Sequence, residues 1–496
     1  MRVRNWIGRL LAGGLALAVT ALAGCASLPL DMRDAGEAVA LPTPDVSIAP
    51  APTGDSRQAD LLRVNLYYPT ADGAQLTEVP RFFRLSGDET LAHRAVRALL
   101  ADPPADGLAR VAAEGTQLLA LEQSGDVAVV NLSVDALNVD DEQALYRARA
   151  AIVATLGGLD GIRWVDLLID GRQEGLLGLP VGVGQADDAG LPAGWAALQA
   201  QAAQPDQPVE RTAIVYCAAR GGRFLAPEAR PIASAGADHI PRLIEELLAQ
   251  PRSGALLAPL PGPNGALSAP PELVKLPDGR AVAQLQFDEN LLALLDEADV
   301  AAWQMYGALC LTLTGFIPEL DGIQAYVGAG QVARLELPGG ALELPGGVMR
   351  RGDFAGAFGR MARLYFAEPE GGLVEVGRVM NQKDAGSPRA LLAALIAGPM
   401  PWEAGRPVVP EGIDAGDLLG VRVEGGEAAV NLSSNFYRYC QGLPEQGERD
   451  LVYAMVNTLT GLTGINRARF YVEGEPVDTL VGAIHLRGPL LPLPLS

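Results

Sequence analysis

The chain has 496 residues, a formal net charge of −21 at pH 7 and only four cysteines. Nucleic-acid-binding proteins need a basic surface for the phosphate backbone, so this acidic composition argues against nucleic acid as a partner. Four scattered cysteines also do not make the disulfide framework of a small secreted domain.

The beginning of the chain has the organisation of a secretory signal. Basic residues precede an apolar run, which ends in Leu-Ala-Gly-Cys at Cys25. This ending resembles the lipobox of bacterial lipoproteins, and the resemblance implies that residues 1–24 are removed and that Cys25 is lipidated. An ordinary signal peptide and an uncleaved anchor helix are the alternatives. Residues 25–60 have little to bury and are predicted to be a disordered tether.

The rest of the chain contains one sequence unit three times. Each copy begins with two strands across a Gly-containing turn, followed by an amphipathic helix that ends before a proline. A second hairpin, a second helix and a closing strand complete the unit. Sixteen residues always separate a threonine in the second helix from the glycine that ends the closing strand. The three pairs are Thr155 and Gly171, Thr312 and Gly328, and Thr458 and Gly474.

The order of elements in each copy is β-β-α-β-β-α-β. This order predicts an α+β fold of three tandem domains, each a small sheet with two helices packed on one face. The predicted boundaries are 61–183 for the first domain, 184–209 for a linker, 210–334 for a divergent second domain, 335–359 for a Pro/Gly linker, 360–489 for the third domain and 490–496 for a tail.

The repeated unit resembles the GerMN domain of sporulation and germination lipoproteins. The resemblance lies in the Leu-Tyr-Tyr start, the Leu-x-Glu-x-x-Arg strand, the Leu-Leu-x-x-Pro helix end, Val-Asn-Leu-Ser and Thr-Leu-Thr-Gly. It implies assembly or scaffolding at the outer face of the cell membrane, with envelope or sporulation-channel proteins as partners, and not catalysis. The presence of three copies departs from the two domains of the spore-germination type.

Few residues offer catalytic or metal chemistry. Ser133, His93 and an acid could form a triad, but the chain has no Gly-x-Ser-x-Gly elbow. Three dispersed histidines without a Cys-x-x-Cys motif predict no zinc site. The acidic run Asp140–Glu142 is interpreted as favourable charge at a helix start rather than as a calcium loop. We therefore expect no catalytic residue, no metal and no cofactor.

Two other motifs have structural explanations. The segment Gly328–Ala333 fits a dinucleotide fingerprint, but the residues after it cannot begin the required helix. Cys217 and Cys310 occupy apolar positions of the repeat and are expected to be buried free thiols, with a Cys217–Cys310 disulfide as the alternative. Cys440 is expected to be a lone thiol.

The sequence favours a membrane-anchored, non-catalytic interaction protein of the cell envelope. The alternative is a ligand-binding or sensory lipoprotein that holds a peptidoglycan fragment or a germinant, and a hydrolase ranks third. A pocket lined by aromatic residues would favour ligand binding, whereas exposed strand edges would favour assembly. Association into a homo-oligomer stays open at this point.

Overall fold

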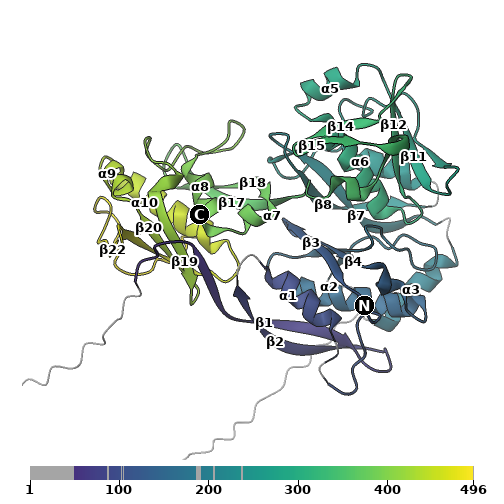
Figure 1. The fold of residues 1–496 in the computed structure, drawn as a ribbon, viewed down its shortest axis with the longest axis horizontal. Helices are drawn as coiled ribbons and strands as arrows, with labels where there is room; N and C mark the ends of the chain where they lie inside the picture. Colours follow the sequence, from purple (N-terminus) through teal and green to yellow (C-terminus); the bar gives the residue numbers. More distant parts are fainter. Residues whose placement is uncertain are drawn as a thin grey trace, which may run out of the picture. The chain divides into compact units, whose positions relative to one another are not determined.

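The structure is a computed structural model that describes residues 50–494 apart from 87–88, 102, 104, 186–190, 205–206 and 236–237 (Figure 1). The predicted signal peptide, Cys25 and the tether as far as residue 49 lie outside the described residues. Within the described part of the chain, no helix is both long and apolar enough to cross a membrane.

The first domain has the expected order of elements. They are β1 (Ser56–Pro69), β2 (Leu76–Ser86), α1 (Leu91–Leu100), β3 (Leu118–Ser124), β4 (Val127–Leu132), α2 (Glu142–Gly157), β5 (Trp164–Ile169) and the short β6 (Gly184–Gln185). The strands β1 and β2 form an antiparallel hairpin, and β4 pairs antiparallel with β3 and parallel with β5. Both helices share one apolar core with β1, β4 and β5, which confirms the predicted α+β class.

The second domain repeats this order with additions. Its elements are α3 (Leu191–Ala202), β7 (Val209–Ala219), β8 (Leu225–Ser234), α4 (His239–Leu248), β9 (Leu256–Leu257), β10 (Glu272–Lys275), β11 (Ala281–Phe287), α5 (Leu291–Glu297), α6 (Ala302–Phe316), β12 (Gly322–Val327), β13 (Gly330–Gln331), β14 (Arg334–Leu337), β15 (Gly340–Glu343) and β16 (Val348–Met349). The segment 184–209, predicted as a linker, contains helix α3. The segment 335–359 likewise holds β15, β16 and most of β14, and its Phe354 is fully buried in the core of this domain.

The third domain has the same order with two short extra helices, α7 and α9, before its closing strand. Its elements are β17 (Gly359–Ala367), β18 (Leu373–Asn381), α7 (Gln382–Ala385), α8 (Pro388–Ile396), β19 (Leu418–Glu424), β20 (Glu427–Leu432), α9 (Ser434–Cys440), α10 (Glu445–Thr460), β21 (Arg467–Val472) and β22 (Glu475–Pro476). The apolar residues Leu451, Val452, Met455, Val456 and Leu459 recur at helical spacing in the sequence of α10, and all five are buried. The periodicity therefore identified the buried face of this helix correctly.

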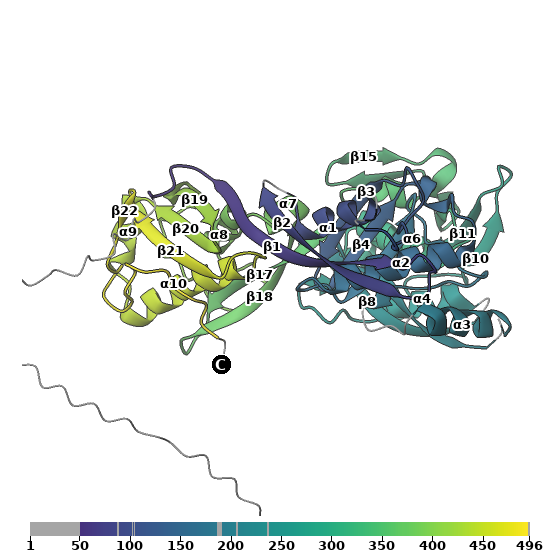
Figure 2. The same ribbon diagram turned by 90° about the horizontal axis from the view of Figure 1, so that it is seen from below.

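The strand β1 extends beyond its own hairpin. Its first residues pair in parallel with β19, with Ser56 opposite Arg422 and Gln58 opposite Glu424. Figure 2 shows β1 as a long strand that reaches from β19 to the hairpin with β2. One sheet therefore has the order β2-β1-β19-β20-β21-β22. The last residues of the predicted tether are part of this strand.

The repeated threonine has a structural role. The backbone N–H of Tyr67 in β1 donates a hydrogen bond to Thr155 Oγ1 of α2 at 3.0 Å, and Tyr216 donates to Thr312 Oγ1 at the same distance. The threonine hydroxyl of the helix thus accepts a hydrogen bond from a backbone N–H of the strand. This N–H lies on the side of the strand that faces away from its hairpin partner. In the third domain Thr458 Oγ1 is buried and has no hydrogen-bond partner among the described residues.

Valine at these positions is expected to give opposite results in the first and third domains. Thr155→Val leaves the Tyr67 N–H buried and unpaired, which should lower the free energy of unfolding by about 1–2 kcal/mol. Thr458→Val removes a hydroxyl that has no partner and should be neutral or stabilising. Thermal unfolding of the two full-length variants measures both effects, and equal destabilisation would contradict this role of the threonine.

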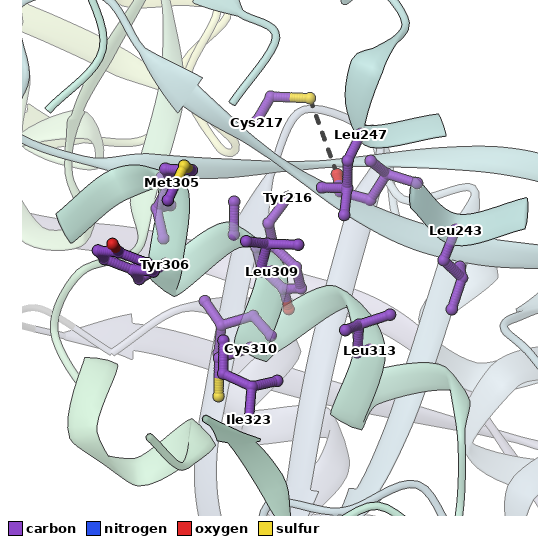
Figure 3. Close-up of a cluster of buried hydrophobic side chains, with 14 of the residues drawn as sticks. Tyr216, Cys217, Leu243, Leu247, Met305, Tyr306, Leu309, Cys310, Leu313 and Ile323 are labelled. Carbon is purple, nitrogen blue, oxygen red and sulfur yellow. Dashed lines mark hydrogen bonds between the residues drawn. The ribbon is translucent and has the colours of Figure 1, made fainter. Parts of the chain in front are cut away.

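The three described cysteines, Cys217, Cys310 and Cys440, lie in the cores as free thiols, and Figure 3 shows the first two. Thirteen of the fifteen residues of α6 are buried, so the helix is enclosed on all sides and Cys310 packs as a small apolar residue. Figure 3 shows Cys217 and Cys310 lying apart. Burial raises the pKa of the Cys217 thiol to about 12, which leaves the unreactive protonated form at neutral pH.

The three thiols Cys217, Cys310 and Cys440 are therefore expected to be unreactive toward Ellman's reagent in the native protein. All three should react once the chain is unfolded in guanidinium without reductant. Mass spectrometry of the unreduced protein should show no crosslinked peptide. A Cys217–Cys310 disulfide would give such a peptide and would leave only one of the three thiols to react.

Candidate functional site: the outer face of the first hairpin

The structure gives the candidate catalytic residues separate, local partners. His93 Nδ1 lies 2.8 Å from Oγ1 of Thr90, the residue that caps α1. Ser133 Oγ donates to Asp135 at 3.0 Å and accepts from the Gln117 N–H at 3.0 Å. These contacts hold a helix start and a strand end, and they do not form the nucleophile–base pair of a hydrolase.

The candidate ligand motifs are also parts of turns and caps. Asp141 accepts the Ala144 N–H at 2.7 Å as the N-cap of α2. Gly328 has a φ of 55° in the tight turn between β12 and β13, so the Gly-x-Gly-x-x-Ala segment opens a hairpin instead of a helix. Among the described residues, no group of three or more His, Cys, Asp or Glu could hold a metal ion.

The outer face of the β1–β2 hairpin combines exposed apolar and basic side chains. Leu61 lies opposite Arg84 and Arg63 lies opposite Phe82, so these four residues share one face of the hairpin. The exposed fractions are 57% for Leu61 and 62% for Phe82. Large apolar side chains with neighbouring charges on one exposed face are typical of a protein-interaction surface. We call these four residues the hairpin face.

The hairpin face carries positive charge on an acidic protein. Arg84 is exposed, and Arg63 has only a distant ion pair with Glu78, at 3.7 Å between Nη2 and Oε1. Exposed pairs of this kind contribute little stability, because water screens both charges. The arginines are therefore available to carboxylates of a partner.

The edge of the same hairpin is less suited to binding. The strand β2 ends its sheet and has one free edge, but Pro80 lies in the middle of it, opposite Asn65. Proline lacks the N–H that strand addition needs, so it interrupts pairing with another chain. The face, and not the edge, is the better candidate for binding a partner.

The sequence itself contains a signal for this surface. In the run Val-Pro-Arg-Phe-Phe-Arg-Leu, alternate residues point to opposite faces of a strand. Phe83 lies on the core side, whereas Phe82 falls on the side of Pro80 and Arg84. A phenylalanine on the polar side of an amphipathic strand is the signal.

Two of the three domains match the model of a known protein family. The family model Germane, described as sporulation and spore germination, matches residues 65–175 and 363–478. A search of curated proteins finds no match.

Solved structures with similarity include the tandem GerMN domains of the sporulation protein GerM from Bacillus subtilis. That match has 18% identity and a TM-score of 0.21, and it covers 59% of this chain and 99% of the other. The first GerMN domain of the same protein matches with 20% identity, a TM-score of 0.19, and coverage of 22% and 84%. A candidate lipoprotein from Clostridium perfringens matches with 25% identity, a TM-score of 0.18, and coverage of 29% and 95%. The family model thus identifies two domains of the sporulation and spore germination family Germane in this chain, within its first and third domains.

Proposed function

We propose that this protein is a membrane-anchored, non-catalytic scaffold of the cell envelope in sporulation or spore germination. A lipid on Cys25 would hold it at the outer face of the cell membrane, and the hairpin face would bind a partner protein. The family model supports the process, and the exposed Leu61 and Phe82 between arginines are the observation that carries the binding role. The charge of the face favours a partner with an acidic surface around an apolar pocket.

The anchor is tested with the variant Cys25→Ser in the full chain. We expect the parent protein to fractionate with membranes and to incorporate labelled palmitate, and the variant to lose the label and enter the soluble fraction. An uncleaved anchor helix would instead keep the unlabelled variant on the membrane.

The scaffold role is tested by placing a photo-crosslinking amino acid at Phe82 in cells of the source organism. We expect a crosslink to one envelope protein, and we expect the added change Arg84→Glu to abolish it. Leu292 is a matched control, because it is 65% exposed on α5 and lies outside the hairpin face. A crosslink that survives Arg84→Glu, or that joins only two copies of this chain, would contradict docking of a separate acidic partner.

A further inference from the structure

A pocket of about 560 Å³ has an unusual excess of hydrogen-bond donors. The starts of β1, α1 and α8 line it together with the helix-end loops 158–162 and 462–464. Its lining contains no Phe, Trp or Tyr, so it does not resemble the aromatic pocket that a sugar or an aromatic ligand would favour. Five of its side chains, however, are arginine or lysine, at positions 57, 63, 360, 383 and 389.

Two guanidinium groups flank the backbone of Gly386 in this pocket. Arg57 Nη1 donates to the Gly386 carbonyl at 3.3 Å, and its Nη2 donates to the Thr463 carbonyl at 2.8 Å. Arg360 Nη1 lies 3.7 Å from the position that a Cβ on Gly386 would occupy. The two cations are therefore neighbours, and Arg57 is held by carbonyl groups and not by a carboxylate.

Neither cation is neutralised by the described residues around it. Among the acids in the lining, Asp55 pairs with Arg389 at 3.2 Å and Glu89 pairs with arginines of α1, while Asp160 forms no ion pair with Arg57 or Arg360 among the described residues. In the described part of the chain, Arg360 has neither a hydrogen bond nor an ion pair. Burial lowers the pKa of Arg57, and burial together with the charge of Arg57 lowers the pKa of Arg360. Placing two like charges side by side is unfavourable unless an anion joins them.

Two further donors of the same pocket lack acceptors. Arg57 Nε and Gln382 Nε2 are buried without a hydrogen-bond partner among the described residues. The Gln382 amide is oriented by its other end, because its Oε1 accepts the Gln123 N–H at 3.5 Å. Buried donors normally find acceptors, and unpaired ones call for an explanation such as a missing ligand.

We propose that this pocket binds an oxyanion, a phosphate or carboxylate group of a small molecule, between Arg57 and Arg360 with Gln382 as a further donor. Arginine suits this role because its planar group presents paired N–H donors to such oxygens. The start of α8, capped by Ser387, adds the positive end of a helix dipole to the same side. Arg63 of the hairpin face also lines the pocket, but the proposed anion ligands Arg57, Arg360 and Gln382 lie outside that face.

The test measures binding of inorganic phosphate and, separately, of acetate to the detergent-solubilised full chain by calorimetry and thermal unfolding. We expect at least one anion to bind and to raise the melting temperature. Arg360→Gln should weaken that binding at least tenfold and should leave the anion-free protein as stable as before or more stable, since it removes a like charge. Arg363→Gln is the matched control on the same strand, because Arg363 is exposed.

Comparing the two anions identifies the chemical class of the ligand. Binding of phosphate alone assigns a phosphate-bearing ligand, and binding of acetate alone assigns a carboxylate-bearing one. Gln382→Leu provides a second variant, which should weaken the same anion without changing a charge. Absence of binding by either anion, or equal binding by the parent and Arg360→Gln, would overturn the proposal, as would an equal loss in Arg363→Gln.

Discussion

Glu448→Gln is expected to lower the free energy of unfolding of the third domain by about 3 kcal/mol or more and to release the C-terminal segment. Glu448 is fully buried on α10, and its carboxylate receives five hydrogen bonds of 2.5–3.0 Å. The donors are the hydroxyl of Thr479 and the backbone N–H groups of Leu480, Val481, Gly482 and Ala483. A glutamine would direct its NH₂ group at some of these donors and leave them unpaired.

Limited proteolysis measures this release directly, because cleavage after residue 478 should become fast in the variant. Glu445→Gln is the control, since Glu445 is exposed on the same helix and should change stability little. Cleavage that is equally slow in Glu448→Gln and the parent would show that other contacts hold the segment.

The same carboxylate gives a pH dependence. Burial would raise the pKa of Glu448, but the hydrogen bonds from the segment 479–483 outweigh it and lower the pKa below the ordinary 4.5. A depressed pKa in the folded state contributes stability that is present above the unfolded value and is lost as the pH falls through the folded one. Thermal unfolding of the parent should therefore weaken below about pH 4.5 more steeply than that of the variant.

Arg378→Met is expected to cost about 3–5 kcal/mol, because it leaves a buried carboxylate without its cation. Arg378 and Glu403 are 9% and 3% exposed, and Arg378 Nε donates to Glu403 Oε1 at 2.8 Å. Arg378 also donates to the carbonyls of Ala394 and Gly398 at the end of α8. The substitution thus removes an ion pair and a helix C-cap together.

The exposed pair Arg363–Glu375 on the same hairpin provides the comparison. Its side chains are 63% and 41% exposed, so Arg363→Met should change stability by less than about 1 kcal/mol. The double variant Arg378→Met with Glu403→Leu should recover much of the loss, since two apolar groups leave no charge unpaired. A double variant as unstable as Arg378→Met would place the effect in the lost helix cap.

Much of the fold could be predicted, because its signals are local. Helix faces follow from apolar spacing, as in α10, and hairpins follow from glycine turns between alternating strands. The arginine of the second strand has a physical role in two of the domains. Arg230 in the second domain donates to the Glu246 and Ala249 carbonyls at the end of α4, as Arg378 in the third domain does for α8.

The parts of the fold and of the site that could not be predicted depend on contacts between residues far apart in the chain. A Pro/Gly composition predicts a linker at 335–359, but β16 within it pairs with β12 and Phe354 fills space beside Gly307 of α6. No pattern inside that segment specifies the surface that it covers. The donor-rich pocket could not be foreseen either, since Arg57 and Arg360 lie three hundred residues apart in the chain and meet only through tertiary structure.

The pairing of β1 with β19 also affects the order in which the protein folds. Asp55, just before β1, accepts the Val421 N–H across a separation of 366 residues. During synthesis the first domain leaves the ribosome early, but the start of β1 has no partner until the third domain has been made. Closing so long a loop is slow, so this pairing should be the last step of folding. The chain would then complete its fold by pairing the start of the first domain with a strand of the third, and a truncation that removed β19 would leave the start of β1 without its partner.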